Sequence, residues 1–181
     1  MPMNLKPVID VPNDGWNYVR RYASWIKDTI RRKTEVVYQD LNIVMTQDVQ
    51  YNLVNLIKNL TPTTGTLAPF FDTTANKLRA YNNNTTMTFK LSLDGQFQGA
   101  TSNRSLLIDF LGTNGNSLVV NRPVGIDIDR ITFALFFSID ANGNIATNGT
   151  EVVLTALGSS YTISKILLIT EQTTNLDTIG V

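Results

Sequence analysis

The chain has 181 residues, in which 15 Lys and Arg balance 15 Asp and Glu, and it contains neither histidine nor cysteine. Without these two residue types it has no Ser-His-Asp or Cys-His catalytic group, no disulfide and no zinc site with thiolate or imidazole ligands. The balanced charge gives no general attraction to nucleic acid, and no stretch reaches the ~18 apolar residues of a membrane span. We therefore expect a protein that is not an enzyme, needs no cofactor and has no membrane partner.

Residues 1–65 are predicted to form an extended arm followed by two amphipathic helices. Prolines at positions 2, 7 and 12 indicate the arm, and Asn13-Asp14-Gly15 offers caps for a first helix over residues 16–33. The helix is too short to predict a coiled coil, so we expect it to pack on the β-rich body or on a larger partner and to anchor the protein. Its apolar stripe consists of Trp16, Val19, Ala23, Ile26 and Ile30.

This first predicted helix is also strongly basic, with Asp28 as its single acidic residue. A basic helix can contact nucleic acid, which leaves open a small coat protein whose helix faces a packaged genome. A solvated basic face is favoured instead, because the remainder of the chain adds no second basic cluster. The basic side chains are Arg20, Arg21, Lys27, Arg31, Arg32 and Lys33.

The rest of the chain is predicted to be mainly β. One or two short strands are expected over residues 34–46, then a second amphipathic helix over 47–60 and a polar hinge over 61–66. Residues 66–181 alternate apolar and polar positions between Asn/Gly turns, one of which is Asp94-Gly95, and this pattern predicts an antiparallel jelly-roll β-sandwich domain. The predicted strands cover residues 77–81, 86–94, 105–112, 117–120, 129–140, 151–156 and 161–171.

Several of these strands are apolar on their second face as well. In residues 131–139 every odd position is apolar and predicts core, yet Phe136 lies on the face expected to be wet. A strand with one solvated face needs only one apolar side, so the second face predicts a self-association surface that loses solvent exposure only on assembly. The alternative is that these second faces belong to the interior of the single chain. The predicted interface residues are Leu107, Leu111, Phe136, Ile166 and Leu168.

The order and texture of the strands carry a resemblance to a known group. The relevant segments are residues 69–78, 88–93, 103–110, 150–155 and 161–170. Together they resemble the trimeric, tumour-necrosis-factor-like jelly-roll modules of tailed-bacteriophage virion proteins, which include capsid decoration proteins, head fibres, short fibres and receptor-binding tips. The resemblance implies a homotrimer in the virion that docks through its N-terminal segment onto a major capsid or tail protein. Because only a short segment precedes the hinge, a compact decoration (cement) protein or a short fibre is favoured over a long fibre.

One loop matches part of a calcium-binding motif. Asp140, Asn142, Asn144 and Glu151 supply oxygen atoms at positions one, three, five and twelve of an EF-hand-like loop. Position six is Ile145, where that loop requires glycine, and the flanking segments are predicted strands rather than helices. We therefore favour an ordinary Asn/Gly hairpin and expect no metal.

A third hypothesis is a tip that binds or hydrolyses a host surface glycan. It would use exposed aromatic residues, of which Tyr81, Phe97 and Tyr161 are candidates, together with a pair of carboxylates. No motif frames the carboxylates, so surface groups near a turn are favoured over a catalytic pair. The carboxylates in question are Asp109, Asp127, Asp129 and Glu151.

Overall fold

The computed structural model describes residues 17–21, 24–83, 85–99, 103–113, 115–124 and 129–175, with the backbone alone over 17–30 and 174–175. Antiparallel strands dominate these residues. The helices among them are α1 (Leu53–Ile57) and α2 (Asn144–Asn148). No helix in this part of the chain has the length and hydropathy to cross a membrane. A mainly β, antiparallel fold is therefore confirmed.

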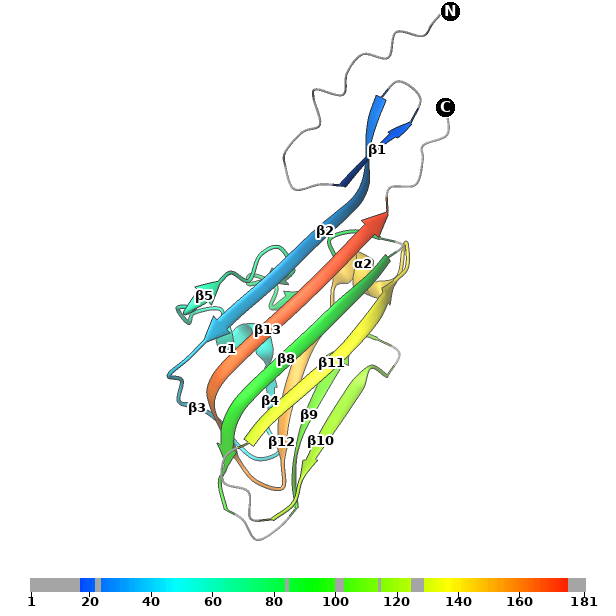
Figure 1. Cartoon of the computed structure of the whole chain (residues 1–181). Coiled ribbons are helices and arrows are strands. Elements are labelled where there is room, and N and C mark those ends of the chain that lie inside the picture. The colour runs from blue at the N-terminus through cyan, green and yellow to red at the C-terminus, as the bar shows by residue number, and fades with distance from the viewer. Residues whose placement is uncertain are drawn as a thin grey trace, which may run out of the picture.

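The larger sheet has 7 strands and forms the front layer in Figure 1. Its strands are β1 (Asn17–Arg21), β2 (Ser24–Tyr38), β3 (Ile43–Met45), β5 (Thr64–Gly65), β8 (Thr85–Phe97), β11 (Asp129–Ile139) and β13 (Tyr161–Asn175). The order across the sheet is β1-β2-β13-β8-β11, while β3 pairs with β13 and β5 with β2. The last strand of the chain thus lies at the centre of the sheet.

The smaller sheet has 4 strands and lies behind the larger one (Figure 1). It consists of β4 (Gln50–Asn52), β9 (Arg104–Leu111), β10 (Ser117–Arg122) and β12 (Glu151–Leu157) in the order β10-β9-β12-β4. A separate pair is formed by β6 (Phe71–Asp72) and β7 (Lys77–Leu78). The expected strands between residue 85 and the end of β13 are confirmed, with boundaries shifted by a few residues.

The apolar core lies between the two sheets. Alternate residues of each long strand enter it, so that β8 and β11 bury one parity and expose the other. Phe110 of the small sheet contacts Phe89 and Phe137 of the large sheet edge-on, with ring centroids 5.1 and 4.8 Å apart. These edge-to-face contacts between aromatic rings add to the burial of apolar area that holds the layers together.

A β-bulge in β13 explains why both parities of this strand are apolar. Ile163 pairs with Gly95 and Lys165 with Asp94, so Ser164 is an extra residue in the ladder. Before the bulge the buried positions of β13 are odd, and after it they are even. Ile166 and Leu168 are therefore fully buried in the single chain. Their prediction as residues exposed until assembly is wrong, and for these two the interior alternative is correct.

The first predicted helix is a pair of strands. Val19 lies in β1, Ile26 and Ile30 lie in β2, and Trp16 lies outside the described residues. Positions four apart share a face in a strand as they do in a helix, so the spacing of Ile26 and Ile30 did not distinguish the two. Antiparallel pairing of β2 with β13 from Thr29 to Tyr38 provides the tertiary context that overrides the helical pattern.

The second predicted helix, over residues 47–60, shrinks to the five residues of α1, which follow β4. Asn52 ends β4 and caps α1, because the Asn55 N–H donates to its side-chain oxygen at 3.0 Å. Since β2 pairs with β13 and β4 pairs with β12, residues before position 65 contribute strands to both sheets. The predicted division into 1–65 and 66–181 therefore runs through both sheets.

The predicted turn at Asp94-Gly95 lies inside β8 instead. Gly95 is needed there for space, because a Cβ atom would stand 2.3 Å from the Thr162 carbonyl oxygen and 2.7 Å from the Tyr161 ring. Glycine inside a strand often marks a place where another part of the chain approaches closely. The strand consequently continues to Phe97.

Candidate functional site

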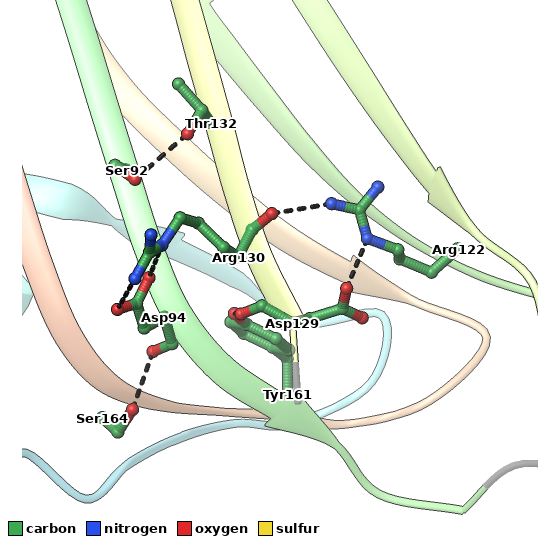
Figure 2. Close-up of polar contacts among 8 residues, drawn as sticks. All are labelled: Ser92, Asp94, Arg122, Asp129, Arg130, Thr132, Tyr161 and Ser164. Atoms are coloured by element: carbon green, nitrogen blue, oxygen red, sulfur yellow. Dashed lines mark hydrogen bonds and ion pairs between the residues drawn. The ribbon is translucent and has the colours of Figure 1, made fainter. Parts of the chain in front are cut away.

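The outer face of the large sheet carries charged and hydroxyl side chains in register. Lys165, Asp94 and Arg130 are cross-strand neighbours on β13, β8 and β11, and Ser92 and Thr132 form the next row. Arg130 donates from Nε and Nη2 to the two carboxylate oxygens of Asp94 at 2.7 and 3.0 Å, and the two hydroxyl oxygens lie 3.0 Å apart (Figure 2). Neighbouring strands thus fix the relative positions of these polar groups.

A hollow of about 290 Å³ lies over this part of the sheet. Hydrogen bonds from Arg130, together with the charges of Arg130 and Lys165, hold the pKa of Asp94 below its usual range despite partial burial. Asp94 is therefore an ionised partner, and the hollow contains three cationic side chains against one carboxylate. Its lining residues are Lys90, Ser92, Asp94, Arg130, Thr132, Lys165 and Leu167.

A second hollow, of about 370 Å³, lies beside the bulge in β13. The Ser164 hydroxyl donates to the Asp94 carbonyl oxygen at 3.1 Å, and Gln98 donates from Nε2 to the Thr162 hydroxyl at 3.3 Å. Its polar lining is made of amides and hydroxyls without a charged group. We call the two hollows together the polar trough. The second hollow is lined by Leu41, Asn42, Gly95, Gln96, Gln98, Thr162 and Ser164.

Beneath the polar trough, a partly buried ion pair joins the two sheets. Arg122 of β10 donates from Nε to Asp129 of β11 and from Nη2 to the Arg130 carbonyl oxygen, while the Tyr161 hydroxyl donates to the Asp129 carbonyl oxygen (Figure 2). Burial first, and then the charge of Asp129, raises the pKa of Tyr161. The phenol stays neutral and the carboxylate is engaged, so this group is a structural connection between the layers.

The carboxylates considered for a catalytic pair do not meet. Asp129 points into the core side of the large sheet, whereas Asp109 lies on the outer side of the small sheet. Glu151 accepts a hydrogen bond from Asn52 at 3.3 Å, and Asp127 lies outside the described residues. The carboxylates with known placement therefore offer no pair flanking a common cleft.

The outer face of the small sheet carries a group of apolar side chains around Asp109. Leu107 and Leu111 of β9 point away from the core, as predicted, and Val119 of β10 is the cross-strand neighbour of Leu107. Leu111 and Val119 are 40% and 51% exposed. We call Leu107, Leu111 and Val119 the apolar face. Sequence reasoning missed Val119, whose neighbour Val120 packs against the core.

Phe136 is the most exposed large apolar side chain among the described residues, at 73%. It stands on β11, the edge strand of the large sheet, between hollows of about 400 and 280 Å³. Its exposure agrees with the sequence prediction. Aromatic side chains are enriched at protein interfaces, so this exposed ring is a candidate anchor for a protein partner.

The side chains of the calcium-like loop have other partners. Asn144 begins α2 and donates to the Gly112 carbonyl oxygen at 2.8 Å, while its Oδ1 accepts from Asn148. Asp140 accepts from the Ser138 hydroxyl, and Glu151 lies beyond α2 in β12. No group of three or more acidic side chains suited to a metal occurs in the described part of the chain. The short helix separates ligands that an EF-hand loop would bring together.

The basic and aromatic candidates are also redistributed. Arg31 forms two hydrogen bonds with Glu171, at 2.8 and 2.6 Å, and Lys33 pairs with Glu35. Arg32 lies against the Tyr81 ring, with 5.1 Å from its guanidinium carbon to the centroid. These side chains alternate along a strand and do not form one basic helical face. Of the proposed glycan-binding aromatics, Tyr81 is exposed, whereas Phe97 and Tyr161 belong to the core.

Comparison with known proteins gives the family. Residues 30–172 match a family described as the Sf6-type phage tail needle knob or tip of some Caudovirales. The chain belongs to this family. The expected location in the virion of a tailed phage is confirmed, and the family is one of structural proteins without known catalysis. The finer prediction is corrected, because the family is that of tail needles and not of capsid decoration proteins, head fibres or short fibres.

Among relatives, the tail needle protein of Shigella phage Sf6 is 43% identical over 144 residues, which cover 80% of this chain and 51% of the relative. The chain thus spans about half the length of this curated protein. Two solved structures are each 12% identical to this chain in sequence. PRD1 vertex protein P5 has a TM-score of 0.47 over 80% of this chain and 96% of that one. The structure of infectious bursal disease virus, Gx strain, has a TM-score of 0.38 and covers 96% of this chain and 42% of that one.

Proposed function

We propose that the chain forms a homotrimeric jelly-roll knob at the tip of a phage tail needle. The strand order supports the jelly roll. Numbered along the chain, the eight strands β2, β4 and β8 to β13 give the order first, eighth, third, sixth in one sheet and second, seventh, fourth, fifth in the other. This is the arrangement of two Greek keys in a jelly roll.

The observation that carries the trimer is the presence of two separate apolar surfaces on one chain. The apolar face lies on the outside of the small sheet, and Phe136 projects from the edge of the large sheet. Because the two surfaces differ, a contact between them is heterologous and closes only as a ring. The apolar face of each copy would cover the Phe136 edge of the next, and three copies would complete the ring.

The N-terminal segment is the proposed connection to the rest of the needle and, through it, to other tail or capsid proteins. The family match begins at residue 30, so the segment that contains Trp16, Val19 and Ile26 precedes the matched region. This supports the anchoring role predicted for that segment, now with Val19 and Ile26 on strands. A capsid decoration role is no longer proposed.

Light scattering combined with native mass measurement on the full chain tests the proposal. We expect the mass of three chains at micromolar concentration, with one symmetric species. A single-chain mass under these conditions would overturn the trimer, while leaving the family assignment intact.

A further inference from the structure

We propose that the polar trough binds an acidic saccharide, with its anionic group at the cationic hollow and its ring hydroxyls at the amide hollow. The cationic hollow offers Lys90, Lys165 and Arg130, and the amide hollow offers Gln96 and Thr162 among its polar groups. All of these residues come from one chain. The inference therefore goes beyond knob assembly and does not depend on it.

The cationic hollow has donors available for an anion. The ammonium group of Lys90 forms no hydrogen bond or ion pair with another described residue. Arg130 uses Nε and one N–H of Nη2 for Asp94, which leaves the N–H groups of Nη1 directed elsewhere. Bonds from such cations to a carboxylate or phosphate are charge-assisted and roughly twice as strong as neutral ones. The excess of two positive charges occurs on a chain whose net charge is zero.

The amide hollow suits the neutral part of the same ligand. Gln96 is exposed and is the cross-strand neighbour of Thr162, so an amide and a hydroxyl stand side by side on the rim. Both groups can donate and accept, as sugar hydroxyls do. The bulge at Ser164 brings this hollow next to the cationic one, because Ser164 and Lys165 are consecutive residues on the same outer face.

Other ligand classes fit the polar trough less well. Its net positive charge opposes a metal cation. A long polyanion such as nucleic acid would also meet Glu35 and Glu171, which lie further along the same outer face. A sugar that carries a single carboxylate or phosphate would bind without approaching Glu35 or Glu171.

Matched sugars test the inference on the full-length chain. We would titrate cellobiouronic acid against cellobiose, and glucose 6-phosphate against glucose, by ligand-observed NMR, with inorganic phosphate as a further probe. We expect each acidic sugar to bind about tenfold more tightly than its neutral partner, a difference of about 1.4 kcal/mol. Comparing the cellobiouronic acid pair with the glucose 6-phosphate pair shows whether the site prefers a carboxylate or a phosphate. Equal binding of acidic and neutral sugars, or inorganic phosphate binding as tightly as the acidic sugars, would overturn the inference.

Variants locate the site. Lys90→Gln and Lys165→Gln should each weaken the preference for acidic sugars and together remove it, whereas Lys33→Gln, which like each single variant removes one positive charge from the same sheet face, should leave it. Gln96→Ala should weaken the binding of acidic and neutral sugars by the same factor. If Lys33→Gln abolished the preference as fully as the double variant, the effect would be general charge and the site would be refuted. Light scattering on the same samples reports assembly separately, so a monomer that binds acidic sugars would refute only the trimer.

Discussion

The two sheets of this protein present opposite kinds of outer surface. The large sheet exposes the ion pair of Asp94 and Arg130 to water, among lysines and hydroxyl groups. The small sheet exposes the apolar face. Both sheets bury an apolar inner side, so the fold itself does not require this difference. Covering charges costs free energy and covering apolar groups releases it. The polar trough on the large sheet is therefore suited to water and small polar ligands, whereas the apolar face and Phe136 are suited to a protein partner.

The largest effect should follow from placing charge on the apolar face. Leu107→Asp with Val119→Asp should convert the proposed trimer to single chains, because each proposed contact would then bury uncompensated carboxylates at a cost of several kcal/mol. Native mass measurement reads the result. Val44→Asp, which adds a carboxylate on β3, on the outer face of the large sheet away from Phe136, should leave the proposed trimer intact. Assembly of the double variant at wild-type concentrations would contradict the comparison.

The bulge in β13 allows a sharper test with two adjacent leucines. Leu168 is fully buried, whereas Leu167 lies on the outer face beside the polar trough. Leu168→Ala should lower the free energy of unfolding by about 2–5 kcal/mol, and Leu167→Ala by about 1 kcal/mol or less. Urea denaturation measures both. Equal losses would mean that the strand does not divide its neighbours between core and solvent as described.

The ion pair on the large sheet predicts a modest dependence of stability on pH. The pKa of Asp94 is lowered in the folded state, so its contribution is present above the unfolded value of about 3.9 and is lost as pH falls through the lower folded value. The pair is largely solvated, and we expect about 0.2–1 kcal/mol. Asp94→Asn should lose this amount at pH 7 and converge with the wild type in acid, once the pH falls below the lowered pKa of folded Asp94. Asp48→Asn is the control, and a difference between Asp94→Asn and the wild type that persisted in acid would argue against the assignment.

The smallest effect should be that of Phe136 on the isolated chain. In the monomeric Leu107→Asp, Val119→Asp background, Phe136→Ser should change the free energy of unfolding by less than about 0.5 kcal/mol, because the ring is 73% exposed. In the wild-type background the same substitution should weaken assembly about tenfold on dilution. A large loss of stability in the monomeric background would show that the ring serves the fold and not the interface.

The strands from β8 onward could be predicted because their solvated face makes the alternation visible. Two physical effects prevented prediction of β2 and of the bulge in β13. The spacing of Ile26 and Ile30 fits a helix and a strand equally, and only pairing with β13 decides between them. The bulge at Ser164 exchanges the buried parity, which made Ile166 and Leu168 look like a second face.

The candidate sites divide in the same way. Leu107, Leu111 and Phe136 could be found from alternation within a single strand, because the sequence itself shows which parity is core. The polar trough depends on which residues of β8, β11 and β13 are cross-strand neighbours. A single sequence does not contain that register. The nearest signal was the outward parity of Lys90 and Arg130.

The pairing of β2 with β13 also has a mechanical consequence. The two strands are antiparallel neighbours from Thr29 and Asn175 to Tyr38 and Ile166, and hydrogen bonds between such strands lie across the strand axis. A pull along that axis at the start of β2 loads the whole ladder in shear, so its bonds resist together. A sideways pull would open them one after another. A knob held through the N-terminal end of β2 should therefore withstand axial force far better than lateral force.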